Sequence, residues 1–133
     1  MSFDLQLKGL RALVTGGTKG IGAAVVEGLR AAGVQVMATA RSAPAESTSG
    51  VTYVAADLTS AEGAAVVARS ALERWGGVDI LVNVLGGSSA PGGGFAALDD
   101  ARWFQELNQN LMPAVRLDRA LLHRKRAAGE KTT

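Results

Sequence analysis

A run of closely spaced glycines, T-G-G-T-K-G-I-G at residues 15–22, is the segment whose residue types point most directly to chemistry. Glycine lets the backbone turn sharply and approach a bound anion without an intervening side chain. An apolar run at 12–14 precedes the glycines and helical spacing follows them, which predicts a strand, a tight turn and a helix. The N-terminus of such a helix attracts a phosphate. We therefore predict that Gly16, Gly20 and Gly22 form a cradle for a pyrophosphate.

The order of these glycines is G-x-x-x-G-x-G, which differs from the G-x-G-x-x-G of the commonest dinucleotide-binding turn. Led by Thr15, this spacing resembles that of the short-chain dehydrogenase/reductase family. The resemblance implies an oxidoreductase that uses a nicotinamide dinucleotide on a carbonyl or alcohol substrate. It also implies that Thr18 and Ile21 contact the cofactor. The alternative is a flexible glycine turn that ends a strand and binds nothing.

The end of the next apolar run, residues 34–40, bears on which dinucleotide is bound. An acidic side chain at this point holds the ribose 2′-hydroxyl of NAD, whereas a cation accommodates the 2′-phosphate of NADP. The sequence has Arg41 and Ser42 here and no acidic residue between 34 and 45, and Lys19 offers a second cation. We therefore expect NADP(H), with NAD(H) the less favoured cofactor. Exposed cations without any ligand are the alternative.

A third strand is predicted over residues 51–56, followed by Asp57 and Leu58. The family resemblance implies that both residues belong to the cofactor site, since an Asp at this strand end lies near the adenine ring. Asp57 could equally cap the turn that follows. The sequence T-S-A-E at 59–62 matches a capping box, and the helix that it begins is expected to end at Gly76.

A fourth strand is predicted over residues 78–85, which are nearly all apolar, as in a strand buried on both faces. The resemblance implies that Asn83 and Gly86 lie beside the cofactor. The family has a second Asn followed by Ala where this chain has Val84 and Leu85, so the hydrogen bond of that second amide is missing. The glycine-rich loop that follows is expected to be a surface connection, with a substrate-side lid as the alternative.

One long helix is expected over residues 99–122, with Asp99 as its N-cap and a kink at Pro113. Its apolar residues cover more than one face, so part of the helix surface is available for another partner. The resemblance gives Asn110 a catalytic role, because the family has a helix Asn that supports a proton-relay water. A role in the helix kink beside Pro113 is the alternative.

The residues that complete catalysis in the family, a Ser and a Tyr-x-x-x-Lys pair, have no match in this sequence. The only tyrosine, Tyr53, lies in a predicted strand and has Asp57 where the lysine would be. Carbonyl reduction needs a proton donor, so we predict that this chain alone is inactive. We expect the cofactor-binding portion of an oxidoreductase, from a truncated or frame-shifted reading of a longer enzyme or from a short paralogue. A non-catalytic nucleotide-binding or interaction module that pairs with another chain is the alternative.

The length of 133 residues suits one domain. We predict an α/β fold over residues 1–122, with a partial Rossmann-like, doubly wound parallel sheet in the strand order 3-2-1-4 between two helical layers. Residues 123–133 are expected to form a basic polar tail, in which His123 is solvated. The tail holds four of the 14 Lys and Arg residues, so the net charge of +2 does not describe the body of the protein.

The same composition bears on partners and location. A body without a basic face argues against nucleic acid, and apolar runs shorter than a membrane span argue against a membrane. No cysteine is present, and we expect no metal site and a cytoplasmic location. We also expect a homo-oligomer, a dimer for example, formed through residues 99–122 or through the open edge of the sheet.

Overall fold

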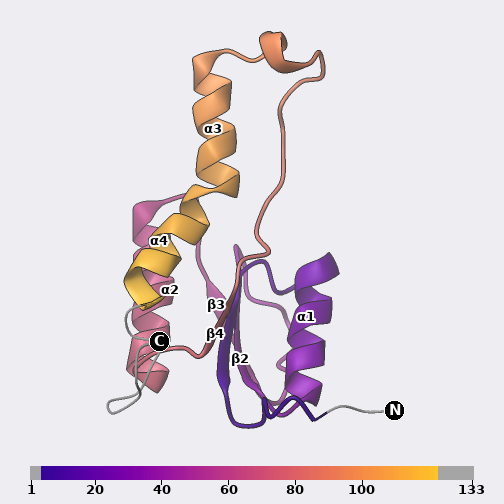
Figure 1. Ribbon diagram of the computed structural model, residues 1–133, viewed down its shortest axis with the longest axis vertical. Helices are drawn as coiled ribbons and strands as arrows, with labels where there is room; N and C mark the ends of the chain where they lie inside the picture. The colour runs from indigo at the N-terminus through magenta and orange to yellow at the C-terminus, as the bar shows by residue number, and fades with distance from the viewer. Residues whose placement is uncertain (1–3, 123–133) are drawn as a thin grey trace.

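The computed structural model describes residues 4–122 and has a parallel four-stranded sheet at its centre (Figure 1). The strands are β1 (Arg11–Val14), β2 (Gln35–Ala40), β3 (Val51–Ala55) and β4 (Ile80–Val82). Their order is β3-β2-β1-β4, which confirms the prediction. Ala12 of β1 is aligned with Val36 of β2 and Ile80 of β4, so β1 lies at the centre.

Helices cover both faces of the sheet, as predicted. Helix α1 (Gly20–Ala31) lies on one face, and α2 (Ala61–Trp75) and α4 (Met112–Leu121) lie on the other (Figure 1). Successive residues of β1 point to opposite faces. Ala12 and Val14 therefore join the core under α1, whereas Leu13 joins the core formed with α2 and α4.

The fourth strand is shorter than predicted, because the chain leaves the sheet after Val82. The backbone N–H groups of Val84 and Leu85 both donate to the hydroxyl oxygen of Thr15, at 3.1 Å each. Thr15 lies just after β1, so its side chain takes over the hydrogen bonds that a longer ladder would have made. The apolar side chains of Val84 and Leu85 thus pack against the two cores beyond the end of the strand.

The N-terminus of α2 differs from the predicted capping box. Ser60 is the N-cap, and its hydroxyl oxygen accepts a hydrogen bond from the N–H of Gly63 at 2.9 Å. The N–H of Thr59 donates to Asp57 instead of to Glu62. The helix ends as predicted, with Gly76 in the left-handed conformation.

The predicted helix over 99–122 is broken into two, α3 (Asp100–Asn110) and α4, at Leu111. Asp99 is the N-cap of α3 as predicted, and its carboxylate accepts from the N–H of Arg102 at 2.9 Å. The break follows from Pro113, which has no N–H to donate to the carbonyl of Gln109 one turn earlier.

The two helices differ sharply in burial. Helix α4 buries Leu117 and Leu121 in the core, whereas α3 has no buried residue and extends away from the sheet at the top of Figure 1. The chain reaches α3 through a long exposed loop and a short 3-10 helix, η1 (Phe95–Ala97). Within residues 4–122, no helix has the length and apolar character needed to cross a membrane. The predicted basic tail and His123 lie outside the described residues.

Candidate functional site

The glycine turn between β1 and α1 is packed so closely that several of its glycines cannot be replaced without movement. A Cβ on Gly22 would overlap the carbonyl oxygen of Gly16. Gly16 and Gly20 have φ values of +62° and +53°, a region that L side chains rarely adopt. Gly17, which the sequence analysis did not single out, is also confined, because a Cβ there would lie 2.7 Å from the Cβ of Ala38.

The first turn of α1 presents backbone N–H groups at the end of this glycine turn. Lys19 is the N-cap and its side chain makes no capping hydrogen bond, and the first turn contains no acidic residue. No side chain of this turn therefore offsets the positive end of the helix dipole, so the N-terminus of α1 favours a bound anion. Ile21 leaves 76% of its surface exposed beside these groups. Thr18 lines a separate cavity of about 130 Å³ between α1 and the β2–β3 connection.

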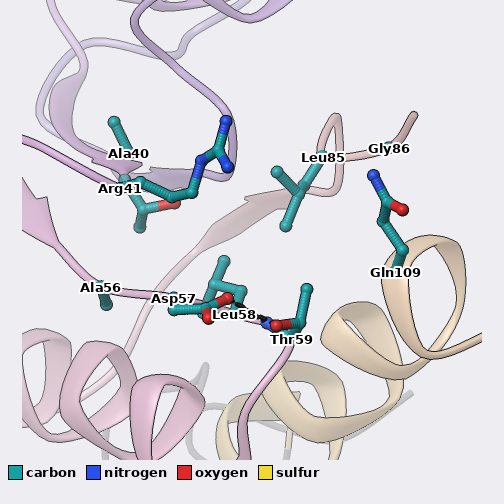
Figure 2. Close-up of a pocket in the computed structure, with 10 residues that line it drawn as sticks. Ala40, Arg41, Ala56, Asp57, Leu58, Thr59, Leu85, Gly86 and Gln109 are labelled. Atoms are coloured by element: carbon teal, nitrogen blue, oxygen red, sulfur yellow. Dashed lines mark hydrogen bonds between the residues drawn. The ribbon is translucent and has the colours of Figure 1, made fainter. Parts of the chain in front are cut away.

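A larger pocket of about 320 Å³ lies at the carboxyl ends of the strands (Figure 2). It brings together segments that follow β2, β3 and β4 with one side chain from α3. Four of the predicted site residues line it: Arg41, Asp57, Leu58 and Gly86. The others that line it are Thr39, Ala40, Ala56, Thr59, Leu85 and Gln109.

Asp57 shapes the turn at the floor of this pocket. One oxygen of its carboxylate, Oδ1, accepts hydrogen bonds from the hydroxyl of Thr59 at 2.6 Å and from its N–H at 2.9 Å. These hydrogen bonds, and then the charge of Arg41, hold the pKa of Asp57 below its ordinary value. Asp57 therefore caps the turn, which was one of its two predicted uses, and presents an ionised carboxylate to the pocket.

Asn110 binds the loop that follows β4. Its Oδ1 accepts from the N–H of Gly87 at 2.9 Å, and its Nδ2 donates to the carbonyl of Gly87 at 2.8 Å and to that of Glu106 at 2.9 Å. The amide thus pairs with both backbone groups of Gly87 and fixes the loop next to the pocket. This is a positioning role beside the break between α3 and α4.

Three further predicted residues also have side chains outside the pocket, namely Lys19, Ser42 and Asn83. The amide of Asn83 donates to the carboxylate of Asp118 in α4 at 3.2 Å. Lys19 and Ser42 are exposed and do not line the 320 Å³ pocket.

The pocket residues that sequence reasoning missed include Thr59, Leu85 and Gln109. Thr59 has a local signal, because a Thr two residues after an Asp is suited to an Asx turn. Gln109 has none, because only the break after α3 and the path of the loop after β4 bring it to this wall. Its contribution therefore depends on contacts between distant segments.

Comparison with known proteins points to one family. A protein-family model described as short chain dehydrogenase matches residues 11–130 of the chain. The comparison with curated proteins found no match.

Among solved structures, the chain is similar to L-sorbose reductase from Gluconobacter frateurii, complexed with NADPH and L-sorbose. The identity is 30% over 96% of this chain and 51% of that one, with a TM-score of 0.80. A short-chain dehydrogenase from Streptomyces avermitilis is 32% identical over 87% of this chain and 44% of that one, with a TM-score of 0.77.

An NADH-dependent reductase responsible for alginate metabolism is 25% identical over 92% of this chain and 53% of that one, with a TM-score of 0.81. The chain therefore spans about half the length of the solved structures to which it is similar.

Proposed function

The chain belongs to the short chain dehydrogenase family of oxidoreductases, and from this premise we propose that residues 4–122 form an NADP(H)-binding portion of an enzyme acting on a carbonyl or alcohol. The observation that carries the proposal is that the glycine turn and the 320 Å³ pocket share the carboxyl edge of the sheet. Ligands of open parallel sheets bind in this position, outside the carboxyl ends of the strands.

Each part of the dinucleotide has a suitable partner at this edge. The pyrophosphate fits the N–H groups of α1, where Gly16, Gly20 and Gly22 let the backbone come close. The adenosine fits the pocket, and Arg41 in its wall suits a 2′-phosphate. The solved structures similar to this chain include an NADPH complex and an NADH-dependent reductase, so the choice between the two cofactors rests on this chain's own residues.

Replacement of Arg41 by Ala is expected to lower the affinity for NADPH by about tenfold or more and to leave the affinity for NADH unchanged. A charge-assisted hydrogen bond to phosphate is worth roughly 1.5–3 kcal/mol, and about 1.4 kcal/mol corresponds to a tenfold change. Calorimetric titration with both cofactors measures the effect. Arg69→Ala, which removes an exposed cation from α2, is the matched control. An unchanged preference in Arg41→Ala would remove Arg41 from this role.

We further propose that the chain alone binds the cofactor without turning over substrate. The hydroxyl of Tyr53 lies 3.5 Å from that of Thr48, and Tyr53 lines the smaller cavity instead of the 320 Å³ pocket. The amide of Asn110 is occupied by Gly87. Loss of the general acid alone commonly costs about a hundredfold to ten-thousandfold.

With aldehydes and ketones as substrates, we therefore expect the chain to oxidise NADPH no faster than the background rate. The absorbance of NADPH measures this rate. The control is Gly20→Asp, which puts a negative charge and a side chain at the glycine turn, where φ is +53°. Turnover in the parent that disappears in Gly20→Asp would contradict the proposal.

A module that pairs with another chain is the second candidate function, and the surface of α3 favours it. Phe104 and Leu107 of α3 and Leu111 at its C-cap are exposed by 71%, 44% and 51%, and α3 buries no residue. The open edge of β4 has no partner strand within residues 4–122. We therefore propose that the chain self-associates through α3 or through this edge.

Light scattering during size-exclusion chromatography is expected to give a mass above that of the 13.6 kDa chain at micromolar concentration. Leu107→Glu should shift the protein towards the monomer if α3 forms the contact, because a charge in an apolar interface is strongly unfavourable. A monodisperse monomer of the parent at all concentrations would exclude self-association.

A further inference from the structure

The side chain of Gln109 is a half-buried amide in the wall of the 320 Å³ pocket. It comes from the last turn of α3, and within residues 4–122 it has no hydrogen-bond partner. An amide offers a donor and an acceptor in one plane. Its position in the pocket wall therefore makes both groups available to a ligand.

The surroundings of Gln109 suit a flat heterocycle. The apolar side chains of Leu58 and Leu85 line the pocket next to it, and Leu58 is only 3% exposed. In Asp57, the Oδ1 oxygen already accepts two hydrogen bonds from Thr59. Figure 2 shows Gln109 and Arg41 on opposite sides of the pocket, with Leu85 and Leu58 between them.

We propose that the Gln109 amide recognises the adenine base of the cofactor and makes this pocket selective for adenine. The inference rests on the proposed cofactor-binding function. The amide oxygen accepts from the N6 amino group while Nε2 donates to N7, which is the pairing that Gln makes with adenine in DNA. Arg41, on the opposite side, is then free for the 2′-phosphate.

The selectivity follows from the arrangement of donors and acceptors on that edge of the base. Hypoxanthine has a carbonyl oxygen in place of the amino group, so both O6 and N7 are acceptors. Whichever way the amide of Gln109 is turned, its oxygen faces one of them. A good bidentate pair of this kind gives tenfold or greater discrimination, by about 1–3 kcal/mol.

The experiment titrates the full chain with NADPH and with the analogue that carries hypoxanthine in place of adenine. The parent is expected to bind NADPH about tenfold more tightly than the analogue. Gln109→Leu should bind NADPH about tenfold more weakly than the parent does. Its preference for NADPH over the analogue should fall from about tenfold to about threefold or less. Gln105→Leu makes the same change one turn earlier on α3, at an exposed residue outside the pocket, and should alter neither value.

Gln109→Glu is the second variant, because it keeps the shape of the side chain and removes the donor to N7. It should also lose affinity for NADPH, and its thermal unfolding curve, like that of Gln109→Leu, checks that the fold is retained. Parent-like affinity and preference in folded Gln109→Leu would overturn the inference while leaving the proposed function intact. A loss of affinity with an unchanged preference would also overturn it. A parent that binds neither dinucleotide would overturn both.

Discussion

Gly22→Ala is expected to abolish dinucleotide binding and to lower the free energy of unfolding by about 3 kcal/mol. The added methyl group would overlap the carbonyl oxygen of Gly16 and lie 2.7 Å from its carbonyl carbon. Both atoms belong to the backbone, so no side-chain rotation relieves the clash. The glycine turn must move away from α1, and the N–H groups that suit the pyrophosphate move with it. Urea unfolding and calorimetric titration with NADPH measure the two effects.

Gly28→Ala is the matched control, because it makes the same change later in the same helix. Within residues 4–122, and apart from the neighbouring backbone of α1 itself, no atom lies within 4 Å of a Cβ at Gly28. Alanine favours a helix over glycine by up to about 1 kcal/mol, so this variant should be slightly more stable than the parent and bind NADPH normally. Equal effects of the two substitutions on stability and binding would show that the close approach at Gly22 is unimportant.

Gly63→Ala is expected to destabilise the protein by a similar amount, about 3 kcal/mol, and to weaken the binding of NADPH. A Cβ at Gly63 would overlap the carbonyl oxygen of Asp57 and lie 3.0 Å from the hydroxyl oxygen of Ser60. The first turn of α2 thus lies directly against the turn at 57–59, which forms the floor of the 320 Å³ pocket. A displaced turn carries the carboxylate of Asp57 out of position.

Ser60→Ala tests whether the loss of stability in Gly63→Ala comes from the close approach of the added Cβ to Asp57, and not only from loss of the N-cap hydrogen bond. It removes the hydrogen bond to the N–H of Gly63 without adding volume, and the loss of such an N-cap costs about 1 kcal/mol. The two variants are compared by urea unfolding. A loss of stability in Gly63→Ala no greater than in Ser60→Ala would mean that the turn accommodates the methyl group.

The elements of this fold could be predicted from the sequence because their signals are local. The apolar run at 12–14, the glycines that follow it and the helical spacing after residue 20 each depend on neighbours along the chain. These local patterns were sufficient to predict the strand β1, the glycine turn and the helix α1 that the structure contains. The strand order, which no local pattern specifies, was predicted from the general topology of doubly wound parallel sheets. Arg41 and Asp57 could be predicted to lie near each other because they come within two residues of the ends of β2 and β3, whose carboxyl ends share one edge.

The tertiary structure alone decided which side chains meet at that edge. Asn83 also follows a strand, yet its amide pairs with Asp118, since α4 packs against that side of the chain. Asn110 turns to Gly87 and Gln109 faces the pocket, because the break at Leu111 sets the direction of α3. Gly17 and Gly63 are restricted by atoms of Ala38 and Asp57, which belong to other segments. Residue type and spacing determine what a segment can form, whereas the partner of each side chain depends on how separate segments pack together.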